Sequence, residues 1–391
     1  MRRLGLFVLS TLLLSCGPSG PPPDFMGARR REVLASMGSQ VVLPMLRRFA
    51  TEAGELEAAT SAYAADRSDT NRTAAQQAWI EAIDAWQEVE VVVVGPAGMS
   101  FVVPGGQDFR DQIYSWPVTN PCRIDQETVE GSYTSPDTFA SELINVRGLD
   151  AMEYLLFPPA GGGNACSAGS PINVDGSWTA LGADGVIDRR AAYAHTLAIL
   201  VQRSAVALRD AWEPGAGNFL AELSTAGDGS TLYASSRDAL NAMTNAIFYV
   251  EVEVKDMKVG EASGITLCPT GETCGVESRY AHRSKEHIQA NLRAFQRVFL
   301  GADPGTEGLG FDDLLRDVGA NDLADRMIAA IANAIVAVAA IPGDLETAIT
   351  SDFASVMAAY EALRAISTPL KTEFVTVLDL DLPMRAPADN D

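Results

Sequence analysis

The chain has 391 residues, of which 47% are hydrophobic, and 51 acidic residues against 29 basic ones give it a formal net charge of −22. The hydrophobic fraction is enough for a core, and the length predicts two domains or one large one. The negative charge argues against nucleic acid and anionic membrane surfaces as partners. It is compatible with the attraction of cations, but we favour solubility alone as its explanation.

Residues 1–15 are predicted to be a signal peptide. Two arginines precede an apolar run that is too short to span a bilayer. The run ends in Leu-Leu-Ser-Cys, which resembles a bacterial lipobox and implies cleavage before Cys16 and lipidation of that cysteine. An ordinary secretory signal with an incidental cysteine is the alternative. Residues 16–26 would form a lipid-anchored linker, and the anchor would be the protein's only contact with the membrane.

Helical periodicity dominates the remaining chain, where alternating patterns are absent. Long helices are predicted at 27–65, 71–94, 136–157, 186–213, 232–259, 277–300, 320–341 and 343–366. Antiparallel helices of this length, joined by short turns, pack as up-and-down bundles. The predicted fold is therefore all-α, with two helical bundles side by side: an N-terminal domain over 27–180 and a C-terminal domain over 181–385.

Two irregular regions interrupt the predicted helices. The first, residues 95–135, is a long insertion in the first bundle and is rich in Gly, Pro and aromatic residues. A loop of that length in a compact domain is usually functional or is held by other elements. The second, residues 158–177, contains two consecutive prolines and three consecutive glycines, so we interpret it as a loop or domain connection.

Four cysteines remain if Cys16 carries lipid, and an even number in an exported protein suggests disulfides. Cys268 and Cys274 flank a short loop and are predicted partners. Cys122 with Cys166 then follows by elimination. The spacing of these cysteines is not typical of a zinc site.

The helix predicted at 71–94 carries an acidic residue on its apolar face. Glu90 follows Trp86 by four residues and Trp79 by eleven, so all three share one face. Glu90 is therefore expected to point toward the core together with the two tryptophans.

A second carboxylate lies in an apolar stripe within residues 145–157. Glu153 has Leu149 at i−4 and Leu156 at i+3, which places all three on one helical face. A carboxylate in such a stripe is costly to bury unless something pairs with it or ligates it. Asp150 precedes Glu153 by three residues and can reach the same point in space.

Glu90, Asp150 and Glu153 form the candidate metal site, because helical bundles build such sites from carboxylates that project inward from facing helices. An all-oxygen set suits Ca²⁺, Mg²⁺, Mn²⁺ or ferric iron better than zinc. The alternative is a structural ion pair, for which three arginines are available: Arg110, Arg123 and Arg147. In either case Glu153 is expected to be buried, to face Glu90, and to have a cation or an arginine beside it.

The predicted helix 277–300 supplies two further candidates, Ser284 and His282. Its apolar face extends back to Ser284 but not to His282, so His282 is expected on the flank, partly exposed, and His287 is expected to be more exposed. The chain has no His-Glu-x-x-His, no Gly-x-Ser-x-Gly and no phosphate-binding glycine loop. These absences argue against the common helical zinc peptidases and against serine or phosphate chemistry.

The chain resembles the imelysin-like family from about residue 70 to about residue 300. Members carry Gly-x-His-x-x-Glu followed by Tyr-Leu-Leu; here Gly148 and Glu153 match, and Asp150 occupies the histidine position. Further segments resemble the family in the same order: 111–117, 121–125, 277–284 and 291–293.

The resemblance implies three hypotheses for function. The first is a lipid-anchored cell-envelope binding protein associated with iron or other metal acquisition, with a divalent cation or iron as its ligand. The second is a metallopeptidase of the imelysin type, and the third is a non-catalytic interaction protein with an unidentified protein partner. We favour the first, and lean against an enzyme, because Asp150 replaces the motif histidine. Gly17 after Cys16 favours the outer membrane or cell surface over the periplasmic side.

Overall fold

The computed structural model describes residues 26–159, 162–268, 274–384 and 386. The predicted signal peptide, the lipidation site Cys16 and most of the linker lie outside these residues. Within the described ranges the elements are helices and no strand occurs, so the predicted all-α class is confirmed. None of the helices in this part of the chain is long and apolar enough to cross a membrane.

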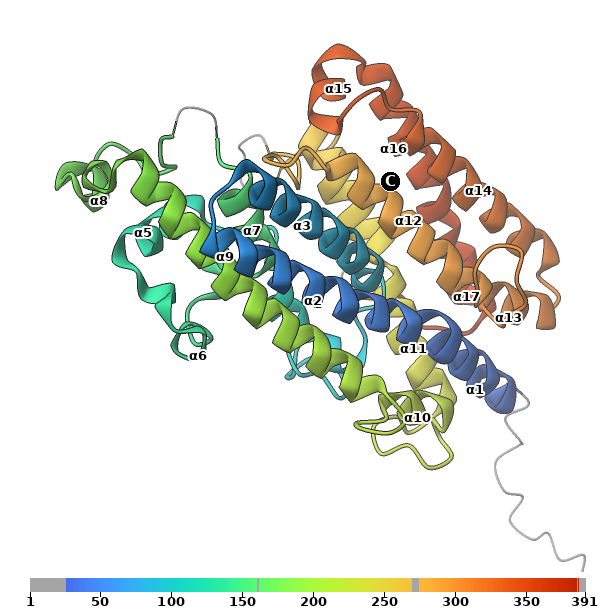
Figure 1. Ribbon diagram of the computed structural model, residues 1–391. Helices are drawn as coiled ribbons and strands as arrows, with labels where there is room; N and C mark the ends of the chain where they lie inside the picture. Colours follow the sequence, from blue (N-terminus) through green and yellow to red (C-terminus); the bar gives the residue numbers. More distant parts are fainter. Residues whose placement is uncertain (1–25, 160–161, 269–273, 385, 387–391) are drawn as a thin grey trace, which may run out of the picture.

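The N-terminal part is one long rod, which agrees with the helix predicted at 27–65 (Figure 1). It consists of α1 (Gly27–Ser36), the π-helical segment η1 (Met37–Val42) and α2 (Leu43–Ala65). Its two ends contact different parts of the fold: α1 packs against α10 (Phe219–Ser224) and α11 (Ser236–Ile247), whereas α2 packs against α3 (Asp69–Glu90) and α9 (Ser177–Trp212).

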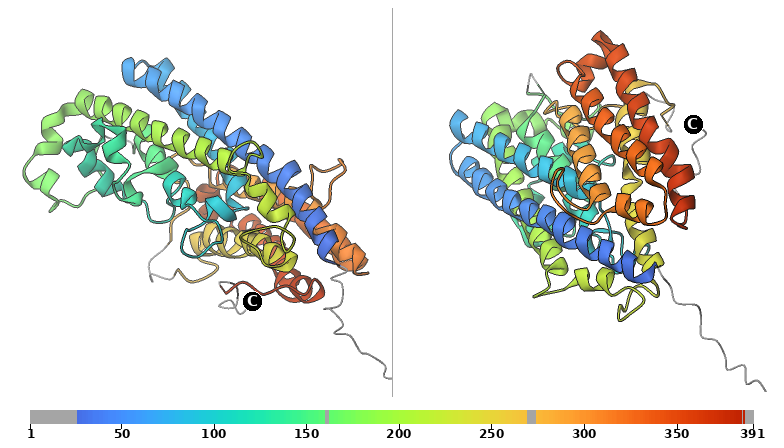
Figure 2. Two further views of the ribbon diagram at one scale, coloured as in Figure 1. Left: turned by 90° about the horizontal axis from the view of Figure 1, so that it is seen from below. Right: turned by 90° about the vertical axis from the view of Figure 1, so that its right-hand side faces the viewer.

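Two groups of helices surround one continuous core. In the first, α2 packs on α3 and α9, and the short helix α7 (Gly148–Leu156) packs on α9 and α3. The second group consists of α12 (Ser284–Leu300), α14 (Asn321–Ala339), α16 (Phe353–Pro369) and the π-helical segment η5 (Val250–Glu261). Contact between α3 and α12 joins the two groups, and Figure 2 shows them from two further sides. Smaller helices complete the fold: α4 (Phe109–Ile113), α5 (Pro121–Glu130), α6 (Pro136–Phe139), α8 (Pro171–Val174), α13 (Phe311–Asp317), α15 (Leu345–Ser351) and α17 (Val375–Val377).

The predicted domain boundary at residue 180 does not coincide with a break in the packing. Helix α9 begins at Ser177 and was assigned to the second domain, yet it packs along α2 and α7 of the first group. Its buried face, which includes Tyr193, Leu197 and Val201, finds its partners there. The sequence pattern identified the helix without identifying the helices that cover it.

The helix predicted at 136–157 is broken, and its failure has a local cause. The chain forms α6, then a short 3-10 turn, and begins α7 only at Gly148. Gly148 has φ +82°, and a Cβ there would lie 2.6 Å from the carbonyl oxygen of Ile113. The chain therefore turns at Gly148 against the long insertion, and only the second half of the predicted helix forms.

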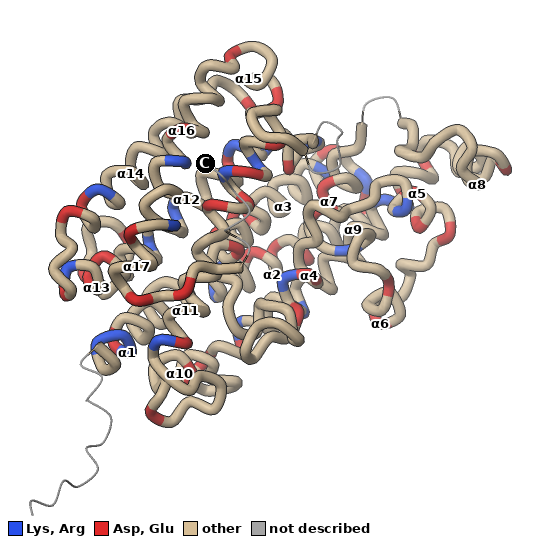
Figure 3. Tube along the Cα trace, turned by 180° about the vertical axis from the view of Figure 1, so that it is seen from behind, with Lys and Arg blue, Asp and Glu red and all other residues tan. Residues whose placement is uncertain are grey.

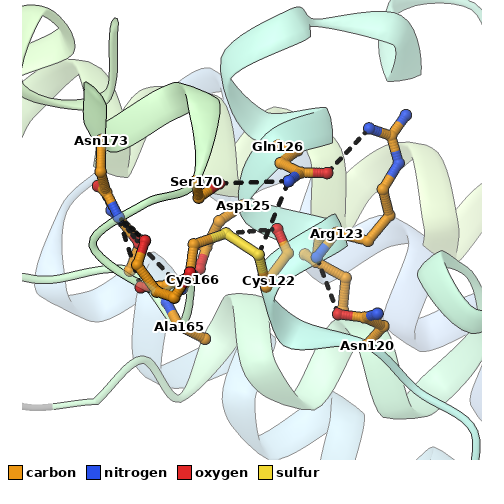
Figure 4. The surroundings of a disulfide bond; sticks show 12 residues. Asn120, Cys122, Arg123, Asp125, Gln126, Ala165, Cys166, Ser170 and Asn173 are labelled. Atoms are coloured by element: carbon orange, nitrogen blue, oxygen red, sulfur yellow. Dashed lines mark hydrogen bonds between the residues drawn. A yellow bond between two sulfur atoms is a disulfide. The ribbon is translucent and has the colours of Figure 1, made fainter. Parts of the chain in front are cut away.

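Both predicted disulfides, Cys122–Cys166 and Cys268–Cys274, are present. Figure 4 shows the first, which joins α5 to the loop before α8. Beside it, Asp125 on α5 accepts a hydrogen bond of 2.7 Å from the backbone N–H of Ala165. A disulfide and a hydrogen bond thus connect the insertion to the loop before α8.

Acidic and basic residues are interspersed along the described chain, as Figure 3 shows. Three arginines, Arg29, Arg30 and Arg31, are consecutive in α1. Many basic residues form ion pairs with neighbouring carboxylates, such as Arg47 with Glu213.

Candidate functional site

A cavity of about 460 Å³ lies where α7, η5 and the segment before α12 meet the long insertion. Four carboxylates line it: Asp150 and Glu153 from α7, Glu261 from the end of η5, and Glu277 from the segment before α12. Trp116 and Met257 complete much of its apolar wall. The cavity therefore collects acidic groups from sequence positions that are more than 120 residues apart.

Asp150 occupies the motif's histidine position and is held by the insertion. Its Oδ2 accepts a hydrogen bond of 2.7 Å from the backbone N–H of Ser115. Burial, with a smaller contribution from the neighbouring charges of Glu153 and Glu277, raises the pKa of the Asp150 carboxyl to about 7. That hydrogen bond and the positive charge of Arg110 oppose the rise. Asp150 can therefore exchange a proton near neutral pH.

Glu153 is buried, and one of its oxygens is committed to the backbone. Oε1 accepts hydrogen bonds from the N–H groups of Tyr280 (2.9 Å) and Ala281 (2.8 Å) and from the Ser278 hydroxyl (2.9 Å). Burial raises the pKa of the Glu153 carboxyl, and the two backbone bonds counteract part of that rise. Among the described residues no arginine pairs with Glu153, so its charge is compensated by N–H and O–H dipoles.

Glu277 is the centre of a buried polar network between the two bundles. Its Oε1 lies 3.0 Å from the Lys258 ammonium and accepts hydrogen bonds from Tyr114 (2.6 Å) and Gln87 (3.0 Å). His287 Nδ1 lies 3.2 Å from the other oxygen. Burial alone would raise the pKa of Glu277, but Lys258 and His287 hold it well below its usual value.

The network extends to Asn291 on α12. Lys258 donates hydrogen bonds to Gln87 (2.7 Å) and Asn291 (2.9 Å), and Asn291 donates to the backbone carbonyl of Gln87 (2.7 Å). We call Gln87, Lys258, Glu277, His287 and Asn291 the inter-bundle network, because they come from α3, η5, the segment before α12, and α12 itself. Residues from both helical groups thereby hold Glu277, the one member of the network that lines the cavity.

Glu90 lies at a different place from the other two predicted ligands. Its Oε1 accepts hydrogen bonds from Arg110 Nη2 (2.9 Å) and Nε (3.1 Å), and its Oε2 accepts one of 2.7 Å from Tyr249. Glu90 lines a second cavity of about 450 Å³, and Trp116, Pro117 and Met257 line both cavities. The ion-pair alternative thus describes Glu90, with Arg110 as its partner.

The predicted trio of Glu90, Asp150 and Glu153 is therefore only partly brought together. In the part of the chain that the structure describes, clusters of three acidic, His or Cys side chains with ligand atoms within 4.8 Å of one another exclude all three residues. One such cluster contains both cysteines of a disulfide, Cys268 and Cys274, and the other lies on the surface around His282.

The other candidates lie outside the cavity. Arg147 donates to the carbonyl of Ala140 and does not reach a carboxylate of the cavity. His282 is exposed, as predicted, and lies 3.1 Å from Glu346. Ser284 is buried and accepts a hydrogen bond from the Ser278 N–H, so it supports the turn that binds Glu153.

Sequence reasoning missed the three central members of the network. Glu277 and Lys258 lie at the ends of predicted helices, where periodicity carries little information. His287 was expected to be exposed; this is wrong, because α12 packs against both α3 and α14 and buries more than one face. One feature of the sequence could have identified Glu277 as a site residue, namely its position as the first residue of a segment that resembles the family.

The fold and this site define a class: an all-α protein of two joined helical groups with a carboxylate-lined cavity between them. A model of the Imelysin family matches residues 42–370, and the chain belongs to that family. It is 27% identical over 154 residues to the iron-regulated protein A of Synechococcus elongatus, a match that covers 39% of this chain and 37% of that protein. The matched region is thus just over a third of that relative's length.

Two solved structures share the fold. A protein from Parabacteroides distasonis, described as an iron-regulated protein A precursor, superposes with a TM-score of 0.70 at 17% identity, over 90% of this chain and 94% of that one. An imelysin-like protein from Psychrobacter arcticum gives a TM-score of 0.67 at 17% identity, over 91% and 98% of the two chains. At this identity the likeness concerns the fold.

Proposed function

We propose that this protein is a cell-envelope binding protein that takes up iron or another metal ion in the cavity lined by Asp150, Glu153 and Glu277. The single observation that carries the proposal is the gathering of these three carboxylates and Glu261 around one cavity of about 460 Å³. Oxygen ligands suit hard cations. The name of the Synechococcus relative supports iron as the first ion to test.

The geometry favours a cation that brings its own ligands or water. Asp150, Glu153 and Glu277 do not converge within 4.8 Å of one another, and one oxygen of Glu277 is already bound by Lys258. A cavity of this size leaves room for a hydrated or chelated ion beside Asp150 and Glu153. Arg279 also lines the cavity and offers a donor to an anionic chelator.

The peptidase alternative has less support from these residues. A hydrolytic metal site usually has three protein ligands, an open coordination position and an activated water. The described lining of the cavity contains no histidine, and Asp150 is tied to Ser115 at the position where the motif has its imidazole.

Calorimetric titration of the purified protein tests the proposal, with ferric citrate, Fe²⁺, Mn²⁺, Ca²⁺ and Zn²⁺ as separate ligands. We expect saturable binding that weakens by at least about tenfold in Glu153→Gln and Asp150→Asn. Glu88→Gln is the matched control, because Glu88 is a buried carboxylate that pairs with Arg48 and Arg297 and does not line the cavity. Its affinity should equal that of the wild type.

Three results would change the conclusion. Absence of binding by the wild type rejects a metal-binding role. Unchanged affinity in both cavity variants moves the site elsewhere. Peptide hydrolysis that disappears in Glu153→Gln supports the metallopeptidase instead.

The proposed location follows from the N-terminal sequence. We propose that Cys16 is lipidated and anchors the protein at the outer membrane or cell surface, with residues 17–26 as a tether. Labelling of cells with radioactive palmitate should mark the wild type and not Cys16→Ala. Absence of label from the wild type would leave an ordinary secreted protein as the alternative, whereas equal labelling of both would place the lipid on another residue.

A further inference from the structure

A separate cavity of about 820 Å³ opens between α3, α7 and α9, in the first bundle. Its walls are largely apolar, with Leu155 and Phe157 at the end of α7 and with Trp178 and Val186 on α9. Tyr280 lines both this cavity and the carboxylate-lined one, so its ring lies in the wall between them. None of the four carboxylates that line the candidate metal site lines this second cavity.

Arg190 is the buried polar group of this cavity. It is 5% exposed, and its guanidinium lies 4.8 Å from the Tyr154 ring centre and 5.6 Å from that of Trp178. Nη2 donates to Asp125 (3.0 Å) and to the Tyr154 hydroxyl (3.2 Å), while Nε donates to none of the described residues. Arg190 is thus a buried donor with two hydrogen-bond partners and with hydrogen-bonding capacity left over.

The charge of this lining is opposite to that of the protein as a whole. Two arginines, Arg72 and Arg190, line the cavity, and no described acidic residue does, in a chain of net charge −22. Asp125 compensates Arg190 from outside the lining. Arg72 pairs at 2.9 Å with Asp69, whose side chain is 90% exposed and therefore well solvated.

We propose that this cavity binds a small organic acid, with an aliphatic or aromatic body against the α7 and α9 walls and its carboxylate near Arg72 and Arg190. The volume lies in the range of small-molecule pockets, about 300–1,000 Å³. Apolar walls stabilise the body by removing it from water, and the arginine donors form charge-assisted hydrogen bonds with the carboxylate. The site is independent of the metal proposal, because it uses neither Asp150 nor Glu153.

Decanoate and decanol test the proposal by calorimetry on the whole protein, because they share one chain length and differ in the acid group. Decanoate should bind saturably with one site per chain. Decanol should bind at least about tenfold more weakly, since it cannot form charge-assisted hydrogen bonds. Binding of decanoate should persist in Glu153→Gln.

Two variants locate the site. Arg72→Gln should weaken decanoate binding about two- to fivefold, as expected for loss of a partly exposed charge. Arg364→Gln is its control, because Arg364 pairs with Glu361 at the same i, i+3 spacing and does not line the cavity. Ile187→Trp, at the partly exposed rim, should fill the space and reduce decanoate affinity by at least about tenfold without changing the unfolding midpoint.

Arg190→Gln is avoided because it would leave Asp125 buried without its cation. The proposal is overturned by any of three results: no saturable binding of decanoate, equal affinities for decanoate and decanol, or decanoate binding unaffected by Ile187→Trp. Equal effects of Arg72→Gln and Arg364→Gln would also reject it, since the charge effect would then be nonspecific.

Discussion

The ammonium group of Lys258 lies 3.0 Å from Oε1 of Glu277, and both side chains are fully buried between the two helical groups. Removing such charges from water is costly, so each depends on the other and on the surrounding hydrogen bonds. Gln87 and Asn291 supply those bonds to Lys258. The candidate site therefore depends on a buried charge pair. Removal of either charge alone should destabilise the whole fold.

Lys258→Met should destabilise the protein by about 3–5 kcal/mol, because it leaves the Glu277 carboxylate buried without its cation. Urea unfolding measures the loss. The double variant Lys258→Met/Glu277→Gln should recover part of it, since neither charge then remains. Arg326→Gln, which breaks the exposed pair with Glu373, should have a much smaller effect. If Lys258→Met and Arg326→Gln lowered the unfolding free energy by similar amounts, the buried pair would have no special role.

Glu153→Ala should cost about 2–4 kcal/mol of unfolding free energy, because three donors lose their acceptor in a buried turn. Glu153→Gln should retain most of the stability, since its amide oxygen can still accept those hydrogen bonds. Thermal and urea unfolding of the two variants measure this difference. If Gln were as destabilising as Ala, the carboxylate charge and not the hydrogen bonding would hold the turn.

Asp150 should make stability depend on pH in a defined window. Its pKa rises from 3.8 in the unfolded chain to about 7 in the fold, so its contribution is fully present below about 4 and is lost as the pH rises through 7. Asp150→Asn does not titrate. Its unfolding free energy relative to the wild type should therefore increase by up to about 1.4 kcal/mol per unit between pH 5 and 7 and level off above that. A difference independent of pH would show that Asp150 has an ordinary pKa.

The two disulfides should contribute unequally. Cys122 and Cys166 are separated by 44 residues, and Cys268 and Cys274 by 6. A longer closed loop restricts the unfolded chain more, so loss of the first bond should cost about 4 kcal/mol and loss of the second about 2 kcal/mol. Paired Cys→Ala variants, compared by urea unfolding, measure both. Equal losses would indicate that the effect on the unfolded chain is not dominant.

Helical periodicity predicted those features that depend on the sequence of a single helix. The burial of Glu90 and Glu153 could be predicted because each lies in an apolar stripe, and the long helices followed from the same pattern. The hydrogen-bond partners of Glu90 and Glu153 could not be predicted in this way. Arg110 contacts Glu90 from the insertion, and the turn before α12, which is distant in sequence, contacts Glu153. The separation of Glu90 from Asp150 likewise depends on where Trp116 and Pro117 lie between them.

The predicted helix boundaries were wrong where tertiary contacts outweigh the local helical preference. Helix α12 begins at Ser284 and not at 277, because Glu153 draws the N–H groups of Tyr280 and Ala281 into a turn. At Gly148 a close approach to Ile113 breaks the predicted helix. Both breaks lie beside the cavity, where local rules are most often overridden by function or strain.

The inter-bundle network also acts as a lock on helix register. Apolar surfaces can slide past one another with little change in energy, whereas Lys258 must meet Glu277, Gln87 and Asn291 together. A shift of α12 by one residue along α3 would remove Asn291 from its hydrogen bonds with Lys258 and Gln87, and would leave these buried groups without partners. The two halves of the molecule are thereby restricted to a single alignment, and the cavity walls that they share keep one shape.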